Sequence, residues 1–187
     1  MISALVNGLN ESPRIVTNCS WALMNLADQL SLYYEDDQET MNGATSSGPL
    51  SPYFSGVVQA LLRLTETAGN ESNFRTAAYE AITSYVSHAT PDCITTVQET
   101  VVAILARTEH LLGLQNQIVG VDDRNNWNEL QSNFCSVVIS VIRKQGDGIQ
   151  PLAYRIMTLL LQLIQAAGKT STVLEGAFVV VGSLAAG

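Results

Sequence analysis

Trp21, Asn25 and Asp28 are the residues whose types and spacing favour ligand binding most directly. At about 100° per residue of an α-helix, they fall on one polar face together with Asn18. An exposed indole packs against the aliphatic stem of lysine or arginine and adds a cation–π attraction of about 0.5–2 kcal/mol. Asn25 would then bond the ligand backbone, and Asp28 would meet the cationic head. The alternative is a Trp21 covered by a neighbouring helix or by the loop that begins at Tyr33.

The helix that carries these residues has clear start signals. Ser12 is a good N-cap and Pro13 suits the first helical position, so a helix is predicted over 13–32. Its apolar residues gather on the face roughly opposite Trp21, and they are Ile15, Cys19, Ala22, Leu23, Leu26 and Leu30. This helix is therefore expected to bury its aliphatic face and to display the tryptophan.

The remainder of the chain repeats the helical periodicity and shows no β alternation. It predicts a short helix end over 2–10 and helices over 50–68, 72–89, 91–114, 127–145, 149–167 and 170–186. The segments 33–48 and 115–126 are polar and are predicted to be loops. The chain is therefore expected to be all-α.

The second helices of successive pairs resemble one another. Cys19-x-x-Ala22-Leu23 aligns with Ala78-x-x-Ala81-Ile82, and more loosely with the segments that begin at Phe134 and Ala177. The matching segments recur about every 40–60 residues, and the longer intervals contain the two loops. This spacing is in the range of HEAT and armadillo arrays, in which each helical pair buries its face against its neighbours. The predicted fold is an α-α superhelix (HEAT-repeat solenoid) of about four helical pairs.

The predicted division of the chain follows these pairs. Residues 1–33 form a HEAT repeat with a truncated first helix, and residues 34–49 an acidic loop that becomes Gly/Ser-rich. Further repeats span 50–89, 90–145 (with a long inter-helix loop) and 146–187. The sequence opens within a helical pattern and stops without a polar cap, so we expect it to be a piece of a longer array.

In the register of the repeats, Trp21 corresponds to Glu80, Ser136 and Val179. One polar inner wall is expected, formed by Asn18, Trp21, Asn25, Asp28, Thr76, Glu80, Ser84, Ser132 and Ser136. The alternative for each residue outside the Trp21 cluster is a merely solvated face.

Composition indicates which partners such a wall would take. The formal charge of −8 and the pI near 4.6 disfavour a nucleic acid or an acidic membrane and favour a basic partner. The longest apolar runs are about half of a membrane span, so no transmembrane segment is predicted. The three cysteines are far apart in apolar helical patterns, which is typical of small buried hydrophobes in a reducing compartment.

Catalytic chemistry finds little support in the sequence. His88 and His110 have no carboxylate or cysteine at ligand or triad spacing. Gly168-Lys169-Thr170 resembles the end of a phosphate loop, but Leu163 stands where the first glycine is required. No catalytic residue, cofactor or metal is predicted.

Three segments, SPRIVTNCSWALMNLADQL, NFRTAAYEAITSYV and NELQSNFCSVVISVIRK, resemble the central HEAT repeats of the importin β (karyopherin β) family in its fungal form. The resemblance covers nearly the whole chain in order. It implies a nuclear import receptor whose concave face binds the basic importin-β-binding segment of importin α, or basic cargo. It further implies regulation by RanGTP, docking to Phe-Gly (FG) nucleoporins, and a location in cytoplasm, nucleus and nuclear pore.

The resemblance also suggests two further contact regions. A loop containing Asp122, Asp123 and Glu129 would approach Ran, and outer grooves would accept a phenylalanine side chain. For the groove residues core packing is the favoured interpretation, and they are Val57, Leu61, Ile104 and Leu159. Glu35, Asp36, Asp37 and Glu39 would add long-range attraction or form a solvated loop. The alternative function is a HEAT-repeat scaffold or adaptor, such as a phosphatase regulatory subunit; an all-helical enzyme is more distant.

Overall fold

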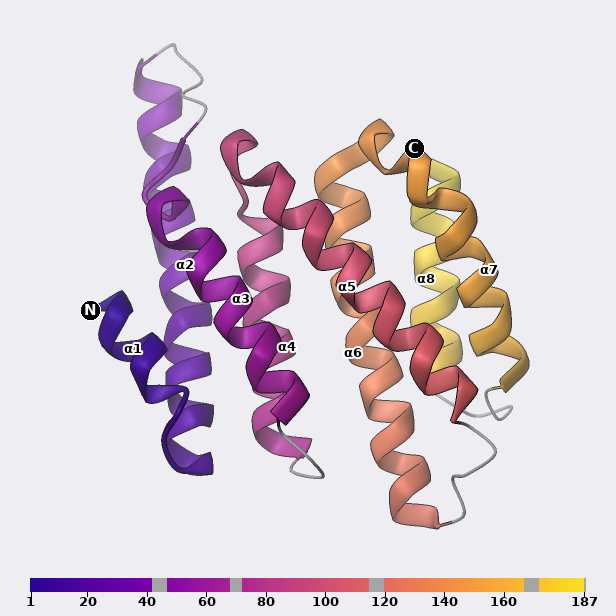
Figure 1. The fold of residues 1–187 in the computed structure, drawn as a ribbon. Coiled ribbons are helices and arrows are strands. Elements are labelled where there is room, and N and C mark those ends of the chain that lie inside the picture. Colours follow the sequence, from indigo (N-terminus) through magenta and orange to yellow (C-terminus); the bar gives the residue numbers. More distant parts are fainter. Residues whose placement is uncertain (42–46, 68–71, 115–119, 167–171, 187) are drawn as a thin grey trace. The chain divides into compact units, whose positions relative to one another are not determined.

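The computed structural model describes residues 1–41, 47–67, 72–114, 120–166 and 172–186. Over these ranges the backbone forms α-helices and short 3-10 helices, without a strand (Figure 1). The chain divides into two compact units, Met1–Gln98 and Glu99–Gly187. The predicted all-α class is confirmed.

The first unit consists of helical pairs that pack side by side. It contains α1 (Ile2–Gly8), α2 (Pro13–Met41), α3 (Ser51–Thr67), α4 (Ser72–Ser87), η1 (Pro91–Cys93) and the first turn of α5 (Ile94–Gly113). Helix α1 packs on α2, α3 packs on α4, and α2 packs on α4 (Figure 1). Helices α2 and α4 therefore form one layer, and α1 and α3 form the other.

The second unit repeats this arrangement of packed pairs. It contains the remainder of α5, then α6 (Val121–Gln145), η3 (Gly146–Ile149), α7 (Gln150–Ala166) and α8 (Thr172–Ala186). Helix α6 packs on α8, and α7 packs on α8 (Figure 1). Thus α6–α8 is the counterpart of α2–α4.

Helices α2 and α4, which pack against each other along a seam, both bury small side chains. Ser20 and Ala27 of α2 and Ala78 and Ala81 of α4 are fully buried, and small residues of this kind let neighbouring helices approach closely. The buried stripe of α2 is Val16, Ser20, Leu23, Ala27 and Ser31. Most of these buried residues lie one position after the residues that were predicted to be buried. Ile15, for example, was expected inside but is 44% exposed. The error arose because aliphatic residues alone do not reveal a seam that uses serine and alanine.

The start of α3 is tied to η1 by a network of hydroxyl groups. Ser51 Oγ lies 2.9 Å from Thr90 Oγ1 and donates to Asp92 Oδ1 at 3.1 Å, and Thr90 Oγ1 donates to the same carboxylate oxygen at 2.5 Å. The hydrogen bond from Thr90 is the main reason that the pKa of Asp92 lies below its usual value. The boundary between the helices predicted over 72–89 and 91–114 is therefore a hydrogen-bonded junction.

Two predicted loops are partly helical. Helix α2 continues to Met41 instead of ending at Leu32, because residues 33–41 contain no glycine or proline, the residues that interrupt helices most strongly. Helix α6 begins at Val121 instead of 127. Asp122 and Asp123 lie in its first turn, where negative charges interact favourably with the helix dipole and stabilise the helix. Residues 42–46 and 115–119 lie outside the described residues, as do the side chains of Glu35, Asp36, Asp37 and Glu39.

The predicted core residues are largely inside. Val57, Leu61, Ile104 and Leu159 are all buried, so core packing, the favoured interpretation, is confirmed for them. Cys93 and Cys135 are buried as expected, whereas Cys19 is only half-buried. Burial raises the pKa of the Cys135 thiol to about 12, so it packs as a neutral side chain. Among the described helices, none combines the length and apolarity that crossing a membrane requires.

Candidate partner-binding wall on helices α2 and α4

Helices α2 and α4 each expose a polar stripe on the side away from their buried residues. The exposed positions of α2 include Asn18, Trp21 and Asn25, at the three- and four-residue spacing of one helix face. The residues that we call the α2–α4 wall are Asn18, Trp21, Asn25 and Asp28 of α2 with Thr76, Glu80 and Ser84 of α4 and His88, which follows α4 directly. The wall lies wholly within the first unit.

Trp21 and Glu80 form the first contact across the wall. The indole Nε1–H donates to Glu80 Oε2 at 3.4 Å, and Trp21 remains 46% exposed. The bond fixes the edge of the ring and leaves its surface open to a ligand. The alternative in which a helix covers Trp21 is therefore wrong for this chain. Glu80 is exposed as well, so an indole and a carboxylate stand together at the surface.

Asp28 forms the second contact, and it joins three side chains. Its Oδ1 accepts from Ser84 Oγ at 2.5 Å and lies 3.2 Å from His88 Nε2. Ser84 Oγ also lies 3.4 Å from the carbonyl oxygen of Met24. The Asp28 and His88 side chains are 43% and 29% exposed, so this cluster also reaches solvent. In a Ser-His-Asp triad the histidine lies between the serine and the carboxylate. Here Ser84 bonds the Asp28 carboxylate directly, so these three residues are not arranged as such a triad.

His88 is the wall residue that the sequence analysis missed. The prediction that His88 lies apart from any carboxylate is wrong, because local spacing cannot show a contact between residues 60 positions apart. The repeat register offered a signal, since Trp21 and Glu80 align with an offset of 59 residues. The same offset of 59 residues aligns Asp28 with residue 87, which directly precedes His88.

The remaining predicted wall residues are divided between the two units. Asn18 and Asn25 are exposed, and Thr76 is half-buried. Ser132 and Ser136 lie on α6 in the second unit, where Ser136 Oγ donates to the Ser132 carbonyl at 3.1 Å. The prediction that all nine residues form one continuous wall stays a prediction.

The residues predicted to form a Ran-contacting loop belong instead to helix α6. Asp122 and Asp123 are exposed in its first turn, and Glu129 is half-buried further along the same helix. The prediction that these residues form a loop is therefore wrong. Their contact with Ran stays a prediction. Gly168-Lys169-Thr170 lies outside the described residues. Within the described ranges, no group of three or more His, Cys, Asp and Glu residues is arranged to hold a metal ion.

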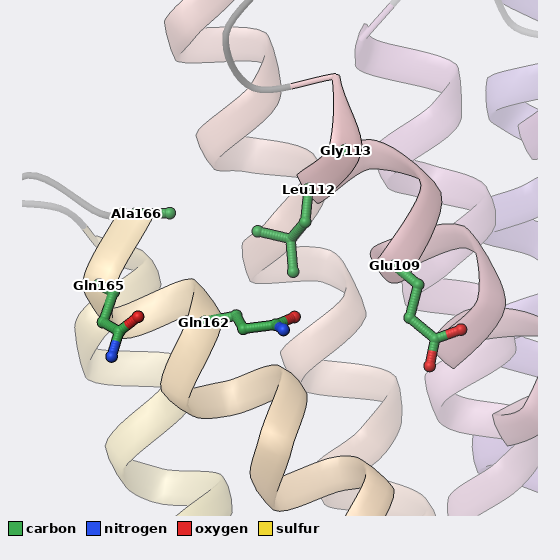
Figure 2. Close-up of a pocket in the computed structure, with 6 residues that line it drawn as sticks. All are labelled: Glu109, Leu112, Gly113, Gln162, Gln165 and Ala166. Atoms are coloured by element: carbon green, nitrogen blue, oxygen red, sulfur yellow. The ribbon is translucent and has the colours of Figure 1, made fainter.

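A second surface feature lies between α5 and α7 in the second unit. It is a hollow of about 520 Å³ with Glu109, Leu112 and Gly113 on one side and Gln162, Gln165 and Ala166 on the other (Figure 2). Arg155 donates to both carboxylate oxygens of Glu109 at 2.7 Å, and these bonds lower the pKa of Glu109. The lining of this hollow therefore combines two amides and a paired carboxylate with Leu112, and it contains none of the four aliphatic residues first considered for a phenylalanine site.

The whole chain matches one protein family. A family model described as "Importin subunit beta-1-like, TPR repeats" matches residues 1–187. The chain belongs to the importin β family. Importin subunit beta-1 of Schizosaccharomyces pombe is 36% identical over 98% of this chain and 20% of the relative. Importin subunit beta-1 of Saccharomyces cerevisiae is 28% identical over 88% of this chain and 18% of the relative.

Solved importin β structures show the same fold. A crystal structure of importin β in an ammonium sulfate condition has a TM-score of 0.88 at 34% identity, over 98% of this chain and 20% of that one. Yeast Kap95p bound to RanGDP has a TM-score of 0.80 at 27% identity, over 99% of this chain and 20% of that one. The predicted HEAT-repeat class is confirmed. The chain spans about a fifth of the length of the curated relatives it matches.

Proposed function

We propose that this chain is part of a nuclear import receptor and that its α2–α4 wall binds basic segments, from importin α or directly from cargo. The observation that carries the proposal is the exposed Trp21 indole held beside Glu80, with Asp28 on the same helix face. An indole surface bordered by carboxylates attracts lysine and arginine through both packing and charge. The role is one of binding without catalysis.

The charge of the whole chain supports the same type of partner. Its 17 acidic residues outnumber its 9 lysines and arginines. Such an excess attracts a basic segment from a distance and repels nucleic acids and acidic membranes. Because Glu80 and Asp28 are the carboxylates of the wall, we expect modest affinity and a strong dependence on salt.

The family supports three finer proposals. In one relative, yeast Kap95p, binding induces the switch loops of RanGDP to adopt the GTP-bound conformation, and we propose that the receptor containing this chain is regulated by RanGTP. Asp122, Asp123 and Glu129 of α6 are proposed to contact Ran. The receptor is also proposed to dock to FG nucleoporins, and therefore to occur in cytoplasm, nucleus and nuclear pore.

Peptide binding tests the proposal. The chain has two tryptophans, and Trp127 is buried, so a Trp127→Phe variant makes Trp21 the sole tryptophan reporter. A basic importin-β-binding peptide should change Trp21 fluorescence at low salt, and the change should disappear as salt rises. With a labelled peptide measured by anisotropy, Trp21→Ala should weaken binding about 2- to 30-fold, as expected for the loss of a cation–π contact of about 0.5–2 kcal/mol.

The controls separate the wall from general charge. Glu99→Gln removes an exposed carboxylate on α5 and should leave binding nearly unchanged. Absence of binding at low salt, by this chain and by a longer one with flanking repeats, would contradict the proposal. A HEAT-repeat scaffold of the phosphatase regulatory type would ignore the peptide in the same way.

A further inference from the structure

The wall contains two subsites that differ in what they leave open. At the first, the Trp21 edge is fixed by Glu80 Oε2, while the ring surface and the second Glu80 oxygen have no hydrogen-bonded partner among the described residues. A flat cation that stacks on the ring while donating to the carboxylate suits this arrangement. Arginine has that shape, whereas the ammonium of lysine is a compact point charge.

At the second subsite, one oxygen of Asp28 is already occupied. Ser84 and His88 both engage Oδ1, and in the described part of the chain Oδ2 accepts no hydrogen bond. A single open oxygen matches one donor, so it does not require the two-pronged geometry of a guanidinium. Lysine is therefore sufficient here.

The distance between the subsites follows from the helix that carries them. Trp21 and Asp28 are seven residues apart on α2, which corresponds to about 10.5 Å at 1.5 Å per residue. An extended segment in the polyproline II conformation rises about 3.1 Å per residue and has three residues per turn, so side chains three residues apart point to the same side and span about 9 Å. A helical ligand would need about seven residues for the same span.

The amides beside Trp21 favour the extended ligand. Asn18 and Asn25 are exposed on the same stripe, and neither side chain makes a hydrogen bond within the described ranges. An extended segment presents backbone N–H and C=O groups that need partners, whereas a helix has already paired most of its own. The wall thus offers both side-chain and backbone recognition to an extended chain.

We propose that the α2–α4 wall selects an extended segment of the pattern Arg-x-x-Lys, with the arginine on Trp21 and Glu80 and the lysine at Asp28. This inference rests on the proposed function, since it specifies which basic segments the same wall prefers. Ser84 and His88 act as positioning residues, because they hold the Asp28 carboxylate and do not themselves contact the lysine.

A spacing series tests the inference on the full chain. Labelled peptides carry one arginine and one lysine, separated by one, two, three, four or six residues, in an otherwise neutral Gly/Ser sequence. The two-residue separation should bind about 3- to 10-fold more tightly than the others. Lys-x-x-Lys should bind several-fold more weakly than Arg-x-x-Lys, whereas Arg-x-x-Arg should bind about equally to it.

Variants assign the subsites. Asp28→Asn should remove the spacing preference, and Glu80→Gln should remove the preference for arginine, while Glu99→Gln should change neither. Ser84→Ala keeps both carboxylates and should weaken the spacing preference only partly, which keeps the test valid if Asp28→Asn disturbs folding. Circular dichroism checks that each variant is folded.

The outcomes separate this inference from the proposed function. Equal affinity for every spacing, or a preference for six intervening residues in a helical peptide, would overturn the Arg-x-x-Lys inference and leave the basic-segment function standing. Failure of every basic peptide to bind, in the wild type and in a longer chain with flanking repeats, would overturn both.

Discussion

The helix pairs α2–α4 and α6–α8 are packed alike at their seams. Ala27 of α2 and Ala81 of α4 are fully buried. On α8, a Cβ added at Gly176 would lie 3.1 Å from the Cβ of Cys135 on α6, so this seam is also too close for a larger side chain. In both pairs, small side chains allow the two helices to approach closely.

Their exposed surfaces differ completely. At the positions that correspond to Trp21 and Glu80 in the repeat register, the second unit has Ser136 and Val179, both exposed. The same backbone arrangement thus carries an indole and a carboxylate in one unit and a hydroxyl and an aliphatic group in the other. Packing constrains the buried face of each helix, and the open face remains free to acquire binding chemistry.

The largest expected effect comes from breaking the α2–α4 seam. Leu23→Ala removes a fully buried side chain of α2 and should lower the free energy of unfolding by about 2–5 kcal/mol. Urea unfolding followed by Trp21 fluorescence in the Trp127→Phe background measures it. Leu32→Ala, at a position that is 57% exposed on the same helix, should change stability by less than about 0.5 kcal/mol. Equal effects of the two substitutions would contradict the assigned burial.

The second prediction breaks the α6–α8 seam instead. Gly176→Val places a branched side chain against Cys135 and should destabilise the second unit by about 1–3 kcal/mol. Its matched control is Gly182→Ala on the same helix, where an added Cβ meets nothing within 4 Å. That change should stabilise by about 0.5–1 kcal/mol through helix propensity. Trp127 fluorescence in a Trp21→Phe background reports on this unit, and a tolerated valine would disprove a close seam.

The third prediction concerns a buried hydroxyl in the core of the first unit. Tyr85 is fully buried, and its hydroxyl has no hydrogen-bond partner within the described residues. Tyr85→Phe keeps the ring packing on Phe54, whose centroid lies 5.9 Å away, and should be neutral or stabilising by about 1 kcal/mol. A loss of stability in thermal unfolding would reveal a hydrogen bond to the hydroxyl.

The same tyrosine makes stability depend on alkaline pH. Burial raises the pKa of Tyr85 to about 12, above the ordinary value of 10.0 that applies when the chain is unfolded. The folded state therefore retains a proton that the unfolded state releases. The contribution of Tyr85 is complete below about pH 10 and is lost as pH rises toward 12. Denaturation midpoints between these pH values should fall less steeply in Tyr85→Phe than in the wild type.

The smallest expected effect on stability comes from substitutions that place the wall's indole and carboxylate on the second unit. Ser136→Trp combined with Val179→Glu places an indole and a carboxylate at the equivalent exposed positions of α6 and α8. Unfolding should change by less than about 0.5 kcal/mol, because neither position is buried. Affinity for a Gly/Ser peptide with a single arginine should rise a few-fold in a Trp21→Ala background, because only the arginine subsite is transferred. An unchanged affinity would show that the repeat register does not superimpose the two surfaces.

Much of the fold could be predicted from local pattern. Ser12-Pro13 marked the start of α2 correctly, and the helical periodicity gave the all-α class. The ends of helices were predicted less well. Helix α2 extends past Leu32 because its acidic continuation is compatible with a helix, and polarity alone did not distinguish a solvated helix from a loop.

The candidate site was predictable only in part. Trp21, Asn25 and Asp28 share one face of one helix, which spacing alone determines. The partners of these residues lie on another helix, and the hydrogen bond from Trp21 to Glu80 depends on how two helices about sixty residues apart align. The register of the repeats correctly predicted that Trp21 and Glu80 are aligned. It did not predict the contact between His88 and Asp28.

The sequence by itself determined which side chains each helix can present together, because helical geometry depends only on residues a few positions apart. Only the tertiary structure decided which face was buried and which carboxylate met which donor. Ser20 and Ala27 of α2 are buried while Ile15 is exposed, and small side chains suit positions where neighbouring helices approach closely. The joining of Asp28, Ser84 and His88 likewise required two helices to pack in one register.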